Sequence, residues 1–165
     1  MKKTIVFILA AVMLALGLVS CKGSGSTDRF SFSVTVKGTK IELAKDAVPV
    51  LSALGEPLSE TPLGDCGGLG ETTKYTFNSF EIQVREKNKS KYIVHIKLTD
   101  DFYKTADNVT IGTLKADVEN AYGEPTTKSS DENSYTYKSG EKSLIIVFRE
   151  GKVSNLEFSF NEQVN

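Results

Sequence analysis

The hydrophobic pattern contains two short stretches, residues 45–57 and 113–125, in which apolar residues recur three and four positions apart. That spacing is typical of a helix with one buried face. Both stretches end in Gly-Glu-Pro, and glycine after the last apolar residue followed by proline marks the end of a helix. We therefore predict two short helices that stop at Gly55 and Gly123. Both glycines should have positive φ, where a side chain is unfavourable.

Elsewhere apolar and polar residues alternate with the two-residue period of half-buried strands. A first hairpin is predicted from residues 30–36 and 41–43, and the Gly-rich segment 58–74 is predicted to be a long loop. Further strands are predicted at 75–77, 80–84, 92–98, 135–137, 144–148 and 153–158. The inward residues of these elements form the predicted core: Val50, Leu51, Leu54, Phe80, Ile82, Val84, Val94, Ile96, Leu98, Val118, Ala121, Tyr122, Leu144, Ile146, Phe148, Leu156 and Phe158.

The order of these segments is similar in the two halves of the chain. The helical stretches match at a spacing of 68 residues and the last strands at a spacing of 60, because the loop after the first helix is longer. Neither half is large enough to bury a good core alone. We therefore predict an α+β fold with two tandem helix-plus-antiparallel-meander repeats, residues 30–100 and 101–165. The repeats share one curved sheet with the helices on one face.

The N-terminus reads as a lipoprotein signal peptide, residues 1–20. A basic start precedes an apolar run of twelve residues, which is too short to span a bilayer comfortably and suits a secretion signal. Leu-Val-Ser-Cys then resembles a bacterial lipobox, which would make Cys21 the lipidated first residue of an exported protein held on the outer face of the cell membrane. The alternatives are an ordinary signal cleaved nearby and an uncleaved anchor helix. Residues 21–29 form a Gly/Ser-rich flexible tether.

Charge excludes one class of partner. Without Lys2 and Lys3, the mature chain keeps 18 basic residues against 21 acidic ones, a net charge near −3 with no basic stripe. Nucleic-acid binding requires such a stripe, so we expect no nucleic-acid partner.

The candidate chemical groups do not form a recognisable active site. The Gly-rich segment 64–70 leads into a strand and lacks the Lys-Ser/Thr of a phosphate loop, so turn formation explains it better. His95 is the single histidine and faces away from the helices by strand alternation, which favours a solvated strand residue. Cys66 is either buried and inert or exposed and able to link chains. The acidic pairs at 100–101 and 131–132 suit turns rather than metal or glycosidase sites. We therefore assign no catalytic residue, no metal ligand and no cofactor, and expect a protein that is not an enzyme.

The pattern as a whole resembles a known family. Tandem units of strand, helix ending in (Leu/Tyr)-Gly-Glu-Pro and strand meander, with Gly-Lys-Val before the last strand, are similar to the β-lactamase-inhibitor-protein-like fold. The unit occurs singly in small outer-membrane assembly lipoproteins of the SmpA/BamE kind and twice in surface lipoproteins of Gram-positive bacteria. In the inhibitor proteins a disulfide cross-links each repeat, whereas Cys66 has no partner here. The aromatic residues with which those proteins block a lactamase active site cannot be placed in this sequence. The resemblance implies a fold, and inhibition does not follow from it.

The expected function is a membrane-anchored, non-enzymatic lipoprotein of the cell envelope that binds another protein or envelope component. The alternative is an inhibitor of a secreted or envelope enzyme. Alternation places a mixed apolar and charged set on the face away from the helices, which suits a recognition surface, although strand propensity alone would also explain outward β-branched residues. This candidate binding face comprises Glu81, Gln83, Arg85, Ile93, His95, Lys97, Ile145, Val147, Arg149, Asn155 and Glu157.

Overall fold

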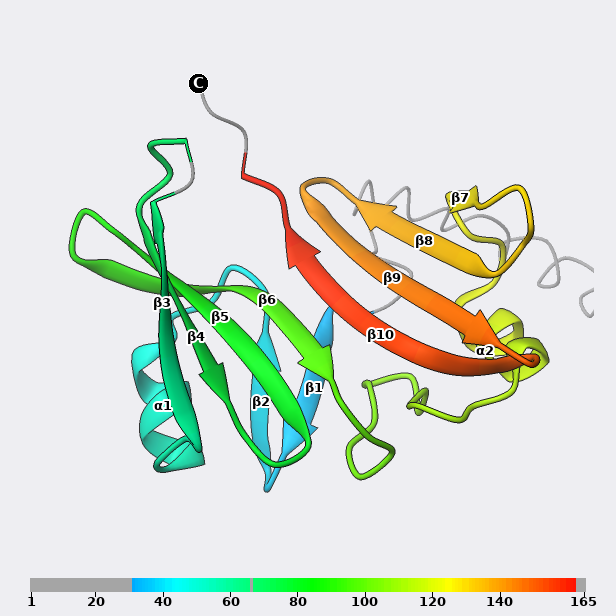
Figure 1. Ribbon diagram of the computed structural model, residues 1–165, viewed down its shortest axis with the longest axis horizontal. Coiled ribbons are helices and arrows are strands. Elements are labelled where there is room, and N and C mark those ends of the chain that lie inside the picture. The colour runs from blue at the N-terminus through cyan, green and yellow to red at the C-terminus, as the bar shows by residue number, and fades with distance from the viewer. Residues whose placement is uncertain (1–30, 66, 163–165) are drawn as a thin grey trace, which may run out of the picture.

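The computed structural model describes residues 31–65 and 67–162, in which ten strands and two short helices make up the regular structure (Figure 1). The first two strands form a separate hairpin, and the other eight form one antiparallel sheet in the order β3-β4-β5-β6-β10-β9-β8-β7. The elements are β1 (Ser33–Val36), β2 (Thr39–Glu42), α1 (Val48–Leu54), β3 (Ser59–Asp65), β4 (Glu71–Thr76), β5 (Phe80–Lys87), β6 (Ser90–Leu98), α2 (Lys115–Tyr122), β7 (Thr127–Lys128), β8 (Ser134–Ser139), β9 (Lys142–Arg149) and β10 (Lys152–Phe160).

The predicted fold class is wrong. Helix α1 has seven residues and α2 has eight, so the described chain is mostly β rather than α+β. The β1–β2 hairpin has no equivalent among the described elements after residue 100, so residues 30–100 and 101–165 are not the predicted pair of helix-plus-meander units. The reason lies in the sequence itself: each helical stretch ends at Gly-Glu-Pro after about two turns, whereas alternating β-branched and aromatic residues occupy far more of the chain. In the described part, neither helix has the length and apolar character to cross a membrane.

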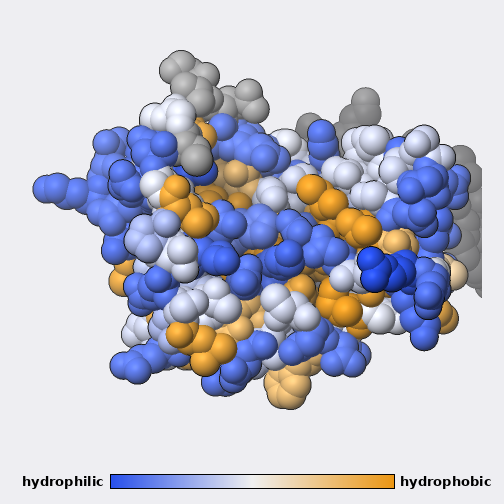
Figure 2. Space-filling model, viewed as in Figure 1, coloured by the Kyte–Doolittle hydropathy of each residue, from blue (hydrophilic) through white to orange (hydrophobic). Residues whose placement is uncertain are grey.

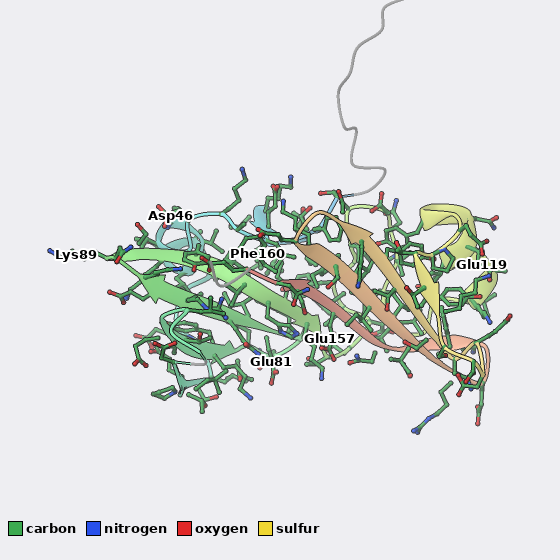
Figure 3. All side chains as sticks on the ribbon, turned by 90° about the horizontal axis from the view of Figure 1, so that it is seen from above. Asp46, Glu81, Lys89, Glu119, Glu157 and Phe160 are labelled. Atoms are coloured by element: carbon green, nitrogen blue, oxygen red, sulfur yellow. The ribbon has the colours of Figure 1, made fainter. Side chains whose placement is uncertain are left out.

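The hydrophobic core lies on one face of the eight-stranded sheet, under α1, α2 and the β1–β2 hairpin (Figures 1 and 3). The inward positions predicted on β5, β9 and β10 are all buried. Ala121 is exposed, contrary to prediction, and Leu51 is only partly buried. The β1–β2 hairpin, the residue after it and β8 supply core residues that were not predicted: Val34, Val36, Ile41, Leu43, Tyr135 and Tyr137.

Strand β6 changes its pairing partner along its length. Its C-terminal half, from His95 to Leu98, pairs with β10. Its N-terminal half bonds instead to the segment that follows β2, because the Ala44 amide donates to the Ile93 carbonyl at 2.8 Å and the Ala47 amide to the Lys91 carbonyl at 2.9 Å. Strands β6 and β10 therefore separate on this side of the molecule.

Segment 58–74, predicted to be a loop, is mostly the β3–β4 hairpin. Strand β3 is exposed at six of its seven positions, so it shows none of the alternation from which a strand can be recognised. It forms one edge of the sheet, and the two-residue β7 forms the other.

Both helices end as predicted, at glycines with positive φ. Gly55 has φ 81° and ψ −162°, and Gly123 has φ 72° and ψ −154°. This backbone region is essentially restricted to glycine, so the constraint is stronger than positive φ alone. The two amides donate to the carbonyls of Leu51 and Glu119, which closes each helix.

Candidate functional site

The face of the eight-stranded sheet opposite the helices, here called the open face, carries the predicted binding residues with one exception. Figure 3 shows Glu81 and Glu157 on the side opposite Asp46 and Glu119, which belong to the helix-covered side. Ten of the predicted residues lie on this face: Glu81, Gln83, Arg85, His95, Lys97, Ile145, Val147, Arg149, Asn155 and Glu157. Nine of them are half-buried, and Arg149 is exposed.

Ile93 is the exception, and its predicted outward placement is wrong. It is fully buried at 0% exposure and belongs to the hydrophobic core. The register between β5 and β6 shifts between Gln83 and Val84, because Gln83 lies opposite His95 while Val84 lies opposite Ile93. The extra residue, Val94, is a β-bulge, and a bulge reverses the alternation of everything beyond it.

A compact polar cluster surrounds Glu157 in the middle of the open face. The Asn155 side-chain amide donates to one carboxylate oxygen at 2.6 Å, and the His95 Nε2 atom lies 3.1 Å from the other. The Lys97 ammonium lies 3.5 Å from the carboxylate. Burial acts to raise the pKa of Glu157, but the hydrogen bonds from Asn155 and His95 and the nearby positive charges outweigh it, so the pKa is lowered.

His95 is on the open face, as predicted, but it is not a solvated residue. Its side chain is only 16% exposed, and its Nδ1 atom is buried without a hydrogen-bond partner in the described structure. Its contact with Glu157 gives it a structural role in the cluster. Among residues 31–65 and 67–162, no group of three His, Cys, Asp or Glu side chains is placed to hold a metal ion.

The two sides of the open face differ in character. Strands β5 and β6 present the charged half, made of Glu81, Gln83, Arg85, His95 and Lys97. Strands β8 and β9 present the neutral half, made of Ser134, Thr136, Ser143, Ile145 and Val147, with Lys138 and Arg149 at its ends. In Figure 2, hydrophilic residues dominate over β5 and β6, and hydrophobic residues show over β9.

Within the neutral half, the two apolar side chains both have uncharged neighbours on β8 but differ in their neighbours on β10. Ile145 is opposite Thr136 on β8 and Glu157 on β10. Val147 is opposite Ser134 on β8 and Asn155 on β10. Both are half-buried, so part of each side chain remains accessible.

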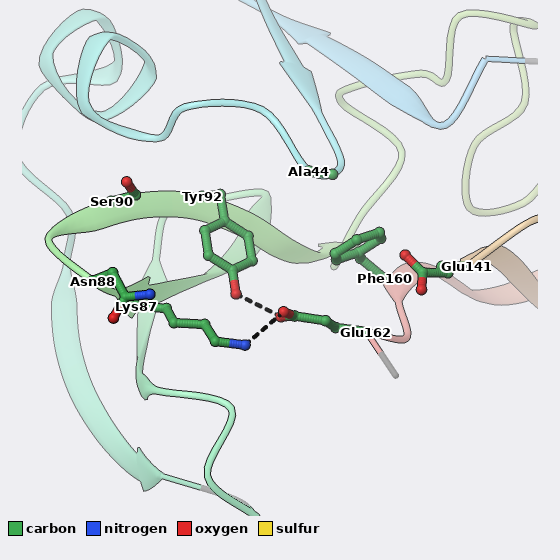
Figure 4. Close-up of a pocket in the computed structure, with 8 residues that line it drawn as sticks. All are labelled: Ala44, Lys87, Asn88, Ser90, Tyr92, Glu141, Phe160 and Glu162. Atoms are coloured by element: carbon green, nitrogen blue, oxygen red, sulfur yellow. Dashed lines mark hydrogen bonds and ion pairs between the residues drawn. The ribbon is translucent and has the colours of Figure 1, made fainter. Parts of the chain in front are cut away.

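A second polar cluster was not predicted and centres on Glu162, which follows β10. The Lys87 ammonium donates to its Oε1 atom at 2.8 Å, and the Tyr92 hydroxyl donates to its Oε2 atom at 2.6 Å (Figure 4). The Arg85 guanidinium lies 3.6 Å away. The hydrogen bonds from Lys87 and Tyr92 lower the pKa of Glu162. Burial and the bond to Glu162 raise the pKa of Tyr92.

This cluster borders an open pocket of about 660 Å³, located where β6 and β10 separate (Figure 4). The pocket is lined by Ala44, Lys87, Asn88, Ser90, Tyr92, Glu141, Phe160 and Glu162. The sequence feature that could have indicated this pocket is the high density of basic residues in the segment 85–91, Arg-Glu-Lys-Asn-Lys-Ser-Lys. The contribution of Glu162 could not be found, because it lies about 70 residues away in the chain.

The acidic pairs serve in turns, as predicted. The Asp100 carboxylate accepts from the Phe102 amide at 2.9 Å, and the Asp131 carboxylate accepts from the Asn133 amide at 3.1 Å. Cys66, the signal peptide 1–20, Cys21 and the tether 21–29 lie outside the described residues.

Comparison with known proteins gives little. No protein-family model matches the chain, and no curated protein matches it either. One solved structure that resembles it is a cysteine-rich secretory protein (SAV1118) from Staphylococcus aureus subsp. aureus Mu50, with a TM-score of 0.47 and 15% sequence identity. The match covers 72% of this chain and 44% of that protein, so this chain spans less than half of its length. A TM-score and an identity this low do not indicate a shared fold or function. The likeness to β-lactamase-inhibitor-protein-like repeats stays a prediction from sequence.

Proposed function

We propose that this chain is a membrane-anchored, non-enzymatic lipoprotein of the cell envelope that binds another protein through the open face. The observation that carries the proposal is the neutral half, where Ile145 and Val147 remain partly accessible beside the uncharged Thr136 and Ser134 of β8. The helices and the β1–β2 hairpin all pack on the opposite face, so no element of the described chain shields these side chains. Partly exposed apolar residues with polar surroundings are typical of protein interfaces.

The distribution of charge favours the neutral half as the centre of contact. Covering Glu157 or Arg85 would remove water from charged groups, and such desolvation offsets much of the gain from any new contact. Covering Ile145 and Val147 removes apolar surface from water at about 25 cal/mol per Å², and the charge penalty is confined to the border with Glu157, which lies opposite Ile145. The charged half would then form the rim of the interface and contribute to specificity.

Strand addition at the sheet edges is the less suitable mode of binding. Strand β3 contains Pro62, which lacks an amide hydrogen, and its register with β4 shifts between Pro62 and Gly64. Strand β7 has only two residues. Proline, irregular pairing and short length are features that protect sheet edges from pairing with another chain.

The membrane attachment in this proposal rests on the sequence around Cys21. Acylation of that cysteine would fix the protein to the membrane, and the Gly/Ser-rich tether would let the open face reach a partner. Replacing Cys21 by Ala should leave unmodified precursor. Mass spectrometry of the mature N-terminus checks this, and a free, unacylated terminus at another residue would contradict the anchoring.

One feature favours the second candidate function, inhibition of a secreted or envelope enzyme. Phe102 is 73% exposed on the connection after β6. The Asp100 carboxylate accepts from its amide, and its ring packs edge-on against Tyr103 at 4.9 Å. An aromatic side chain held outward on a short turn could enter the cleft of a target enzyme.

A capture experiment tests the proposed function. The wild-type chain, attached to cells by its own anchor, is compared with an Ile145→Glu/Val147→Lys variant for chemical crosslinking to envelope proteins. The variant should lose a crosslinked partner that the wild type retains. The matched control, Val48→Glu/Leu58→Lys, places the same charges at positions that are 56% and 68% exposed and belong to α1 and to the segment that follows it. Equal capture by the folded open-face variant would refute the proposal, and loss of capture in a Phe102→Ala variant alone would favour the inhibitor.

A further inference from the structure

The cluster around Glu162 contains more hydrogen-bond donors than its carboxylate satisfies. Lys87 takes one carboxylate oxygen and Tyr92 takes the other. The Arg85 Nη1 atom is left 3.6 Å from the carboxylate, buried and without a hydrogen bond in the described structure. The Arg85 side chain is only 13% exposed, and its Nε atom is already fixed by the Thr72 hydroxyl at 3.3 Å. A guanidinium held in this way needs a further acceptor oxygen.

The local charge also exceeds what Glu162 neutralises. The β5–β6 hairpin carries four basic residues and one acidic residue between positions 85 and 91, in a chain whose formal net charge is −1. The one acidic residue, Glu86, is paired with Lys91 at 3.4 Å. Without Glu162, the two cations Arg85 and Lys87 would have no acidic partner from their own hairpin. Lys87 lines the pocket, and Arg85, which does not, lies 3.6 Å from the lining residue Glu162. Glu141 lines the far side of the pocket, beside Phe160 (Figure 4).

From these two observations we infer that the pocket where β6 and β10 separate binds a phosphate group, and that Glu162 occupies the phosphate position when no ligand is bound. A tetrahedral phosphate offers three or more acceptor oxygens, so Lys87, Tyr92 and Arg85 could each take one. Two negative charges would also match the two cations. Ser90 and Asn88 line the same pocket and can donate to the rest of a phosphorylated molecule.

The volume sets the size of the ligand. A pocket of about 660 Å³ lies within the usual range for small-molecule sites and is larger than a phosphate ion needs. The Tyr92 and Phe160 rings, edge to face at 6.4 Å, give it an apolar wall. The site therefore suits a phosphate ester, either a free metabolite or a lipid head group. This inference is independent of the open-face proposal, because Ile145 and Val147 take no part in it.

Calorimetric titration of the full-length chain in an uncharged detergent tests the inference, with inorganic phosphate as the first probe. Wild type should bind phosphate weakly, because Glu162 competes for the same donors. Glu162→Gln and Glu162→Ala should each tighten binding about tenfold, since the competing charge is gone. Lys87→Gln should weaken binding about tenfold in the Glu162→Gln background. Lys91→Gln is the matched control: it removes the same charge from the same hairpin but does not contact Glu162, and should change binding less than about threefold.

Further probes separate the sources of the phosphate. Acetate should bind at least about tenfold more weakly than phosphate, because it offers only two oxygens. Glycerol 3-phosphate binding better than phosphatidic acid in mixed micelles would indicate a free metabolite, and the reverse order would indicate a lipid head group. The inference is overturned if the Glu162 variants bind phosphate no better than wild type, or if Lys91→Gln weakens binding as much as Lys87→Gln. Either result would mean that the cluster only holds the segment after β10 in place.

Discussion

The charged half and the neutral half of the open face occupy neighbouring strands of one sheet but are built differently. In the charged half, side chains on β5 and β6 are tied into clusters by Glu157 and Glu162, which belong to β10 and the segment after it. In the neutral half, uncharged side chains of β8 and β9 lie side by side around Ile145 and Val147. The same strand geometry thus supports a cross-linked polar surface on one side and a partly apolar surface on the other.

The difference indicates a division of roles. Hydrogen bonds between distant segments stabilise the fold, so the charged half helps to hold β6 against β10, where only four residue pairs join the strands. The side chains of the neutral half do not hold β6 against β10, so they remain available for contact with a partner. Two pairs of substitutions and one single substitution test this difference, and they follow in order of expected effect on the free energy of unfolding.

The largest effect is expected from the two faces of β9 itself. Ile146 is fully buried, so Ile146→Ala should lower the free energy of unfolding by about 2–5 kcal/mol through lost burial and a new cavity. Ile145→Ala, on the open face, should cost less than about 1 kcal/mol because the side chain is already partly in water. Urea denaturation of the two variants checks this. Similar losses for both would mean that Ile145 is a core residue and that the neutral half is not an available surface.

The next effect concerns the charged half. Glu157→Gln should cost about 1–3 kcal/mol, because it weakens the contacts with His95, Lys97 and Asn155 together. The matched substitution in the neutral half, Thr136→Val, should stay within about 0.5 kcal/mol. Thermal unfolding of both variants gives the comparison. If Thr136→Val destabilised the protein as much as Glu157→Gln, the polar residues of the two halves would be equally structural.

The pH dependence of the Glu157→Gln effect has a defined sign. The folded-state pKa of Glu157 is lowered below its ordinary value of 4.5, so its stabilising contribution is complete above that pH. As the pH falls through the lowered folded-state pKa, the carboxyl group takes up a proton and the contribution disappears. The difference in melting temperature between wild type and Glu157→Gln should therefore narrow below pH 4.5. A difference that widened in acid would contradict the assigned contacts.

The smallest effect is expected from Lys97→Gln. The Lys97 side chain is 36% exposed and lies 3.5 Å from the Glu157 carboxylate, so its loss should cost less than about 1 kcal/mol. The loss should nearly vanish in 1 M salt, where charges on the surface are screened within about 3 Å. Melting curves at low and high salt check both points. A large loss that salt did not reduce would indicate that Lys97 acts through packing.

The sequence predicted local features well and their assembly less well. Strand alternation placed Phe80, Ile82 and Val84 inward correctly, because packing against the core dominates there. Gly55 and Gly123 could be placed at positive φ because helix ends depend on the few residues around them. The predicted fold class was wrong, because short helices and long alternating runs favour a β fold. The alternation of residues also does not show how strands are ordered in a sheet.

The failures at the site have specific physical causes. Ile93 was predicted to face outward because the β-bulge at Val94 depends on how β6 pairs with β5 and cannot be recognised from the alternation of residues alone. Strand β3 was missed because an edge strand with little burial need not alternate. The pocket beside Glu162 depends on a contact across the sheet between residues about 70 positions apart, which no local pattern can reveal.

Site-specific photo-crosslinking on intact cells tests whether a partner binds the neutral half of the open face. A photoreactive amino acid replaces Thr136, which lies opposite Ile145 in the neutral half, or Gln83, which lies opposite His95 in the charged half. Both positions are half-buried on the open face, so the two probes differ mainly in the half that they report. We expect a discrete protein adduct from position 136 and a much weaker one from position 83. An adduct from position 83 alone, or none from either position while the protein is folded and anchored, would contradict it.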